Sequence, residues 1–229
     1  MQGGVLLLHG HGRFGASMAL LARGARRADY ATLAPSYPYR RSLEEIVAWL
    51  APRVATFEAE FAGPLHIVTH SLGGLVARAL IAARRPQKLG RVVMLAPPNG
   101  GSELADLLIR LRLDRVALGG AGAHLRTERA EADEAALGVV DYPLGIIAGD
   151  RALLPLSLGL LPRPHDGKVS IAATHVAGLA DHVTLPVTHT LMVYDRRVIR
   201  AALGFLRDGA FDGALADGVS ARLGDSTES

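Results

Sequence analysis

Short, nearly continuous apolar runs alternate along this chain with longer stretches whose apolar residues recur at helical spacing. Such runs predict buried parallel strands, because strands covered on both faces lose the polar–apolar alternation. The expected strands are residues 5–9, 30–34, 65–69, 91–96 and 144–148. The stretches that separate or follow these strands predict helices at 16–28, 42–61, 72–85 and 193–206. This alternation predicts an α/β fold, with a mostly parallel sheet and helices on both faces.

The longest predicted helix carries its own boundary signals. Ser42 precedes its first apolar residue and Glu45 follows three positions later, which is the pattern of a capping box. Pro52 lies inside the same pattern and predicts a kink or a break, because proline lacks the amide hydrogen that the helix needs there.

Two regions depart from the alternation. Residues 97–140 contain two helical patterns, at 103–111 and 127–137, around a glycine-rich link at 119–122. This predicts a small helical insertion, which is either a lid or a long crossover. Residues 212–229 are small, polar and glycine-rich, and predict a flexible tail behind a single domain of residues 1–211.

Composition narrows the function classes. The chain has 229 residues, enough for one α/β domain, and no cysteine, so a disulfide framework and any thiolate nucleophile or metal ligand are excluded. The net charge is +3, but the arginines are scattered along helices, so we expect no nucleic-acid partner. No basic leader and no membrane-length apolar run is present, which predicts a cytoplasmic protein without stable membrane insertion. Nothing in the pattern indicates an oligomeric state.

The most informative segment is residues 64–74, PLHIVTHSLGG. An apolar strand ends just before Ser71, and a helical pattern begins just after Gly74. This layout resembles the nucleophile elbow of the α/β-hydrolases, in which a strained turn between strand and helix presents a serine. Thr69 stands where the usual pattern has its first glycine, whereas Gly73 keeps the second. The alternative interpretation is an ordinary strand-to-helix turn.

A serine hydroxyl needs a neighbouring base, and that base needs an acid to orient it. In this superfamily the order along the chain is Ser, Asp or Glu, His. The resemblance favours His189 as the base, because it lies in the loop before the last helical pattern. His175 and His182 are the rivals, and His70, beside the serine, is interpreted as structural.

The acid has more than one candidate. A strand-end pattern G-x-x-D would place it three residues after Gly149, but Ala152 occupies that position. The segment HDGKVS resembles the later D-G-x-V arrangement of lipase-like members and favours Asp166. Asp150 and Asp181 remain alternatives, and an Asp-Gly turn without catalytic meaning is the plainer interpretation of Asp166.

The early segment LLLHGHGR resembles the oxyanion loop of the same superfamily. Acyl transfer requires backbone amides that point at the developing oxyanion. The resemblance implies the amides of His11 and Leu72. His9 and His11 could also suggest a metal site, but two histidines without nearby carboxylates are a weak signal, and we expect no metal and no cofactor.

The segment LAPPNGGSELADLL also resembles a stretch of lipase-like members, and Ser102 within it fits a helix cap. Leu104, Leu107, Leu108 and Leu111 then form an apolar face that lines the acyl pocket or packs on the sheet. Together the motifs resemble a lipase/esterase-like serine hydrolase acting on a small-molecule carboxylic ester. A thioesterase, an acyltransferase or a non-catalytic binding module on the same fold remains an alternative.

Overall fold

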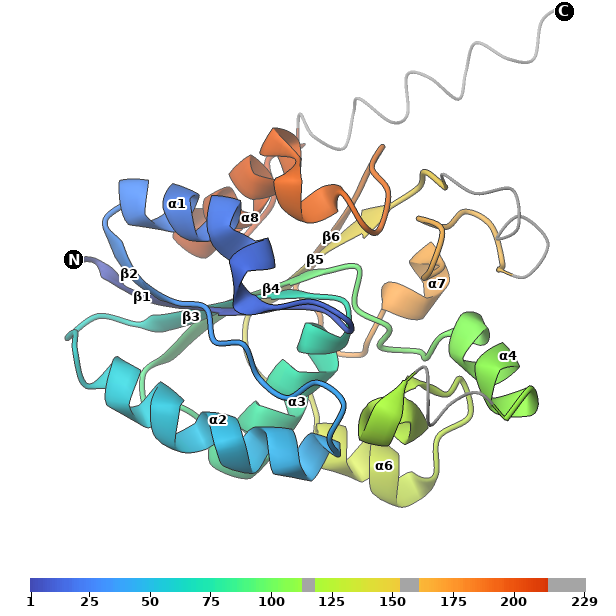
Figure 1. The fold of residues 1–229 in the computed structure, drawn as a ribbon. Helices are drawn as coiled ribbons and strands as arrows, with labels where there is room; N and C mark the ends of the chain where they lie inside the picture. The colour runs from blue at the N-terminus through green and yellow to red at the C-terminus, as the bar shows by residue number, and fades with distance from the viewer. Residues whose placement is uncertain (113–117, 153–160, 214–229) are drawn as a thin grey trace, which may run out of the picture.

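The computed structural model describes residues 1–112, 118–152 and 161–213. One parallel sheet, in the order β2-β1-β3-β4-β5-β6, forms the centre of the molecule (Figure 1). The strands are β1 Gly3–Leu8, β2 Tyr30–Leu33, β3 Leu65–His70, β4 Leu89–Leu95, β5 Leu144–Gly149 and β6 Asp181–Leu185. The predicted parallel α/β fold is therefore confirmed.

Helices cover both faces of the sheet. Those in the described part are α1 Ala19–Arg27, α2 Leu43–Glu58, α3 Leu72–Arg84, α4 Glu103–Arg110, α6 Glu131–Leu137, α7 Ile171–Thr174 and α8 Arg196–Asp208. Short 3₁₀ turns lie at η1 Gly15–Met18, η2 Gly119–Leu125 and η4 Met192–Tyr194. Figure 1 shows α1 and α8 on one face, with α2, α3 and α6 on the other. None of these helices combines the length and the apolar character needed to cross a membrane.

The sheet separates two apolar layers. Successive side chains of a strand point to opposite faces, so Val5 and Leu7 pack in the layer under α1 and α8, whereas Leu6 and Leu8 pack in the layer under α2 and α3. All four are fully buried. Burying one such side chain contributes about 1.5–3 kcal/mol, which explains why the central strands read as continuous apolar runs.

The edge strand β6, Asp181–Leu185, was not among the predicted strands. Its sequence DHVTL alternates polar with apolar residues, and only Val183 and Leu185 are buried. An edge strand has one neighbour and one half-exposed face, so it needs fewer apolar residues than the central strands. A search for continuous apolar runs therefore overlooks it.

Helix α2 begins as the sequence predicted and continues through Pro52, where a kink or a break was expected. The Ser42 side chain accepts from the Glu45 amide, and the Glu45 carboxylate accepts from the Ser42 amide, which confirms the capping box. The helix runs through Pro52 without interruption, so a break there was wrong. Leu50 and Val54, on either side of the proline, are buried in the core. Their packing offsets the one missing backbone hydrogen bond.

The excursion after β4 differs from its prediction in one segment. Residues 119–122, expected as a link, belong to the 3₁₀ turn η2. Gly119 and Gly120 lie against the backbone of residues 40–42, where an added Cβ would come within 2.6 Å of Arg40 O and Ser42 N, respectively. Glycine is thus required by close packing rather than by flexibility. The second expected helix of this excursion is shorter than predicted and begins at Glu131.

Three sequence predictions fall wholly or partly outside the described residues. These are the tail from residue 214 onward, the middle of the excursion at 113–117 and the side chain of Leu108. The predicted flexibility of the tail stays a prediction.

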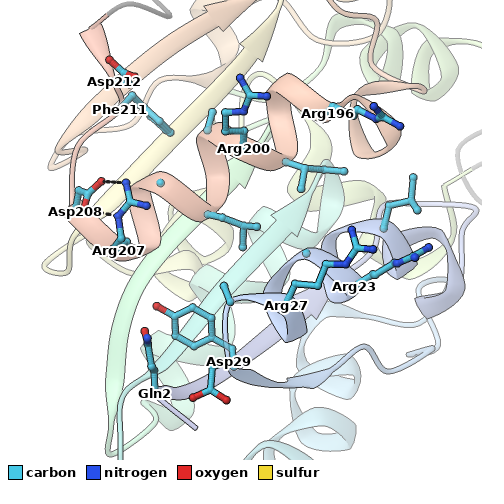
Figure 2. A pocket seen from close by; sticks show the side chains of 18 of the residues that line it. Gln2, Arg23, Arg27, Asp29, Arg196, Arg200, Arg207, Asp208, Phe211 and Asp212 are labelled. Carbon is cyan, nitrogen blue, oxygen red and sulfur yellow. Dashed lines mark hydrogen bonds and ion pairs between the residues drawn. The ribbon is translucent and has the colours of Figure 1, made fainter.

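A groove of about 1620 Å³ runs between α1 and α8 (Figure 2). Arg23 and Arg27 line it from α1, and Arg196 and Arg200 line it from α8. Among the residues that the structure describes, none lines both this groove and the cavity at Ser71.

Candidate active site

Ser71 occupies the turn between β3 and α3. Its φ of +54° and ψ of −123° are unusual for a residue with a side chain, and such strain persists only where the surrounding structure fixes it. The Ser71 amide donates to Leu95 O at 2.8 Å, and the Gly74 amide donates to Ser71 O at 2.8 Å. The turn is therefore held from both sides, with the serine at its apex.

The glycines after Ser71 let α3 approach the sheet closely. An added Cβ at Gly73 would lie 2.5 Å from Leu8 O, and one at Gly74 would lie 2.8 Å from Pro97 Cβ. A Cβ at Gly74 would also meet Thr69 Oγ1 at 3.5 Å, so the Thr69 side chain lies beneath the first turn of α3. Thr69, which replaces the first glycine of the usual pattern, is thus fully buried and fits without displacing α3.

Asp166 and His189 form a buried pair. The Nδ1 of His189 lies 2.7 Å from Asp166 Oδ2, and the two side chains are 5% and 1% exposed. The other carboxylate oxygen accepts from the amides of Lys168 and Val169, each at 2.9 Å. The His189 amide donates to Asp166 O at 3.0 Å. Because the carboxylate only accepts, Nδ1 carries the hydrogen and Nε2 is left as the acceptor.

Asp166 reaches the end of β5 although it follows that strand by seventeen positions in the printed sequence. An added Cβ at Gly149, the last residue of β5, would lie 2.9 Å from Asp166 Cβ. The carboxylate thus comes from beside the strand end, while Ala152 stands where a strand-end acid was sought. Asp150 instead pairs with Arg151 at 3.3 Å.

Asp181 has a different task. The Asp181 carboxylate accepts hydrogen bonds from the backbone amide of His182 at 2.8 Å and from that of Phe211 at 2.7 Å. It therefore ties the segment after α8 to the edge strand β6.

The other candidate histidines are engaged elsewhere. His70 is fully buried and its Nε2 donates to His189 O at 2.9 Å, which helps to hold the histidine loop. Burial keeps the pKa of His70 well below its usual value, so the ring is neutral. His182 stacks on His175 with 4.2 Å between ring centroids, and burial lowers the pKa of His182 to about 4. Neither His175 nor His182 lines the cavity at Ser71.

Ser71 and His189 line the same cavity, which measures about 220 Å³. His11 and Leu72, the predicted oxyanion residues, line it too. Leu72 is the first residue of α3, so its amide has no acceptor within the helix. An added Cβ at Gly10 would lie 3.1 Å from Ser71 Cβ, which places the loop after β1 directly beside the serine.

The His9 side chain, which belongs to the same predicted loop as His11, packs against an aromatic ring. Its ring stacks on Tyr37 with 4.0 Å between centroids, and the Tyr37 hydroxyl donates to His9 O. Within residues 1–112, 118–152 and 161–213, no three His, Asp or Glu side chains are grouped so that they could hold a metal ion.

The excursion after β4 forms the apolar wall of the cavity. Leu104 and Ala105 of α4, together with Leu118 and Leu125, face the same space as Ser71. The Ser102 hydroxyl accepts from the Ala105 amide and caps α4, as predicted. The wall is anchored because the Arg129 guanidinium donates to the carbonyls of residues 98 and 99. One face of α4 thus contributes to the cavity, and Ala105 on that face also packs in the buried apolar layer under α2 and α3.

The sequence matches the model of the alpha/beta hydrolase family over residues 5–218. The chain belongs to this family. No curated protein matches it. Among solved structures, this α/β-hydrolase is similar to a Bacillus licheniformis lipase, BlEst2 in mature form, with a TM-score of 0.68 and 17% identity over 88% of each chain.

Two further solved structures resemble this α/β-hydrolase. One is reported with the metagenome-derived lipolytic enzymes LipS and LipT; it has a TM-score of 0.64 and 18% identity, over 90% of this chain and 94% of the other. The other is the type II thioesterase BorB from the borrelidin biosynthetic cluster, with a TM-score of 0.58 and 19% identity over 90% and 92%. At such identities the likeness establishes the fold alone.

Two cationic side chains of this α/β-hydrolase line the cavity and were not singled out from the sequence. They are Arg13 and Lys168. Each lies two residues from a predicted site residue, Arg13 after His11 and Lys168 after Asp166. That closeness was the available signal, but scattered basic residues are usually solvated, and only the fold shows which of them face a cavity.

Proposed function

We propose that this α/β-hydrolase cleaves carboxylic esters through an acyl-enzyme formed on Ser71. The observation that carries the proposal is the buried Asp166–His189 pair, which opens on the same cavity as a serine held in a strained strand-to-helix turn. A structural turn needs neither the strain nor the oriented histidine. Their coincidence in one cavity supports nucleophilic catalysis.

In the proposed acylation step, Ser71 Oγ attacks the ester carbonyl carbon while His189 Nε2 takes its proton. Asp166 keeps Nδ1 protonated and stabilises the imidazolium that forms. The tetrahedral intermediate collapses, the carbon–oxygen bond to the alcohol breaks, and His189 gives its proton to the leaving oxygen. The acyl group remains on Ser71.

In the proposed deacylation step, water enters where the alcohol has left. His189 removes a proton from this water as it attacks the acyl carbon, and the acid departs as Ser71 regains its hydrogen. The amides of His11 and Leu72 are the proposed donors to the oxyanion in both steps, which fits their position in the cavity. No cofactor is needed for this sequence of steps.

A panel of substrates with matched acyl groups tests this function. We expect p-nitrophenyl esters to be hydrolysed with burst kinetics when acylation outpaces deacylation. Matched acyl thioesters and an added alcohol acceptor measure the competing activities. Faster turnover of the thioester at equal acyl length, or transfer to the alcohol in preference to water, would replace the ester-hydrolase assignment by the corresponding one.

The wall formed by α4 predicts how acyl length is selected. Leu104→Ala enlarges the cavity, so we expect the preferred ester to shift toward longer acyl chains, with a stability loss below about 2 kcal/mol because Leu104 is only half-buried. Both quantities are measured on one variant, by the ester panel and by denaturant unfolding. Leu107→Ala is the matched control, since Leu107 is also half-buried on α4 but does not line the cavity. A loss of about 2–5 kcal/mol with unchanged chain-length preference would mean that Leu104 is core and not pocket.

A further inference from the structure

Two cationic side chains, Arg13 and Lys168, line the cavity, and neither forms an ion pair with a carboxylate of residues 1–112, 118–152 or 161–213. The Arg13 guanidinium donates to Thr190 O at 2.9 Å and to the Tyr194 hydroxyl at 3.1 Å, both of which are neutral acceptors. The Lys168 amide binds Asp166, but its ammonium donates no hydrogen bond within the part of the chain that the structure describes. Arg13 is thus held in position by neutral acceptors, with no described carboxylate paired to its charge.

No Asp or Glu side chain is among the described residues that line this cavity. The Asp166 carboxylate, behind His189, already accepts hydrogen bonds from His189 and from two backbone amides. Burial and the charge of Arg13 lower the pKa of Lys168, and Asp166 only partly offsets them. Burial lowers the pKa of His11, and the positive charges of Arg40 and Lys168 lower it further, so Lys168 acts on a second residue of the cavity.

The two cationic side chains lie on the side of the proposed reaction centre that holds Asp166 and His189. Arg13 binds the carbonyl of Thr190, the residue after His189, and Lys168 lies two residues beyond Asp166. His189 protonates the leaving alcohol in the proposed mechanism, so the alcohol departs on this side. The apolar wall that includes Leu104 and Leu125 is left for the acyl chain.

We infer that the substrate is an ester of an apolar acyl group with an alcohol that carries an anionic group such as phosphate, bound by Arg13 and Lys168. This inference rests on the proposed ester hydrolysis and adds the substrate class. Both cations suit a phosphate, because a fixed guanidinium and a mobile ammonium each form charge-assisted hydrogen bonds with its oxygens.

The test compares 1-butyrylglycerol 3-phosphate with 1-butyrylglycerol, which share the same ester bond. Both are short enough to stay dissolved as monomers, so the comparison reports the charged group and not a lipid surface. We expect kcat/KM to be about tenfold or more higher for the phosphate, and this ratio to fall about tenfold in Lys168→Gln and in Arg13→Gln. Raising the salt concentration to 0.5 M should shrink the ratio as well.

Arg200→Gln is the matched control, because it removes one exposed positive charge from the groove between α1 and α8. It should leave the ratio unchanged. An equal fall in this control would mean that overall charge, not the cavity, attracts the anion, and would overturn the inference. A second pair, mono-p-nitrophenyl adipate and p-nitrophenyl hexanoate, places the carboxylate on the acyl side. A preference for the adipate that exceeds the phosphate preference would overturn the assignment to the alcohol side.

A binding measurement separates this inference from the proposed function. Calorimetric titration with glycerol 3-phosphate should show binding that weakens about tenfold in Lys168→Gln, and glycerol should not bind. If neither ester is cleaved, the proposed function fails while this titration still decides whether the cavity recognises the anion. If both esters are cleaved at equal rates and glycerol 3-phosphate does not bind, ester hydrolysis stands and the anionic substrate class is wrong.

Discussion

Replacing Ser71 with alanine is expected to lower kcat/KM for p-nitrophenyl esters by about 10⁴-fold or more while the protein stays folded. The hydroxyl is the proposed nucleophile, and without it no acyl-enzyme forms. Alanine keeps the Cβ that already sits at a positive φ, so the strained turn should persist. Ester hydrolysis and thermal unfolding, measured on the same preparation, check the two halves of this expectation.

Ser102→Ala provides the matched control, because Ser102 is a second serine that lines the same cavity. Its hydroxyl caps α4, so its loss should cost about 1 kcal/mol of stability and leave most of the hydrolysis intact. Hydrolysis that survives in Ser71→Ala but disappears in Ser102→Ala would identify Ser102 as the nucleophile and would contradict the assignment to Ser71.

His189→Ala is expected to be nearly as damaging as Ser71→Ala, because the members of such a group act as a unit. Asp166→Asn should cost about 10⁴-fold in kcat by a distinct route. The amides of Lys168 and Val169 would retain the side-chain oxygen of the new asparagine and direct its NH₂ toward His189. His189 Nδ1 would then have to accept, Nε2 would carry the hydrogen, and the ring could no longer take the serine proton.

Asp150→Asn serves as the control for the acid, since Asp150 directly follows β5 and, among the described residues, its carboxylate pairs with the neighbouring Arg151 rather than with a histidine. It should retain most of the activity. A loss in Asp150→Asn that matches or exceeds the loss in Asp166→Asn, with both proteins folded, would identify Asp150 as the acid.

Much of the fold followed from the sequence because burial on both faces leaves a strong signal. The central strands β1, β3, β4 and β5 are fully or largely buried and read as continuous apolar runs. The capping box of α2 was legible because its two hydrogen bonds join residues only three positions apart. The edge strand β6 left a weaker pattern, and the 3₁₀ turn η2 depends on packing against residues far away in the chain.

The candidate site was predictable in part for the same reason. The strand–Ser–helix layout at Ser71 is local, so its turn could be anticipated from residues 64–74 alone. The contact between Asp166 and His189 joins residues 23 positions apart. In the sequence, only the resemblance of HDGKVS to a D-G-x-V arrangement favoured Asp166 over Asp150 and Asp181. The catalytic roles themselves stay predictions.

What the sequence could not provide was the environment of the cavity. Arg13 and Lys168 resemble other scattered basic residues until the loop after β1 and the segment after β5 converge beside Ser71. The carboxyl ends of parallel strands meet along one edge of the sheet, so loops distant in sequence gather there. The side chains of these loops together set the charge of the cavity, and a short sequence pattern cannot predict which of them line it.

Labelling with a p-nitrophenyl alkylphosphonate tests the central claim most directly. The reagent should react stoichiometrically with the native protein, release one nitrophenolate per chain, and leave the phosphonyl group on the peptide that contains Ser71. Ser71→Ala should take no label, and His189→Ala should react far more slowly. Stoichiometric labelling of another residue, or equal labelling of Ser71→Ala, would contradict the account.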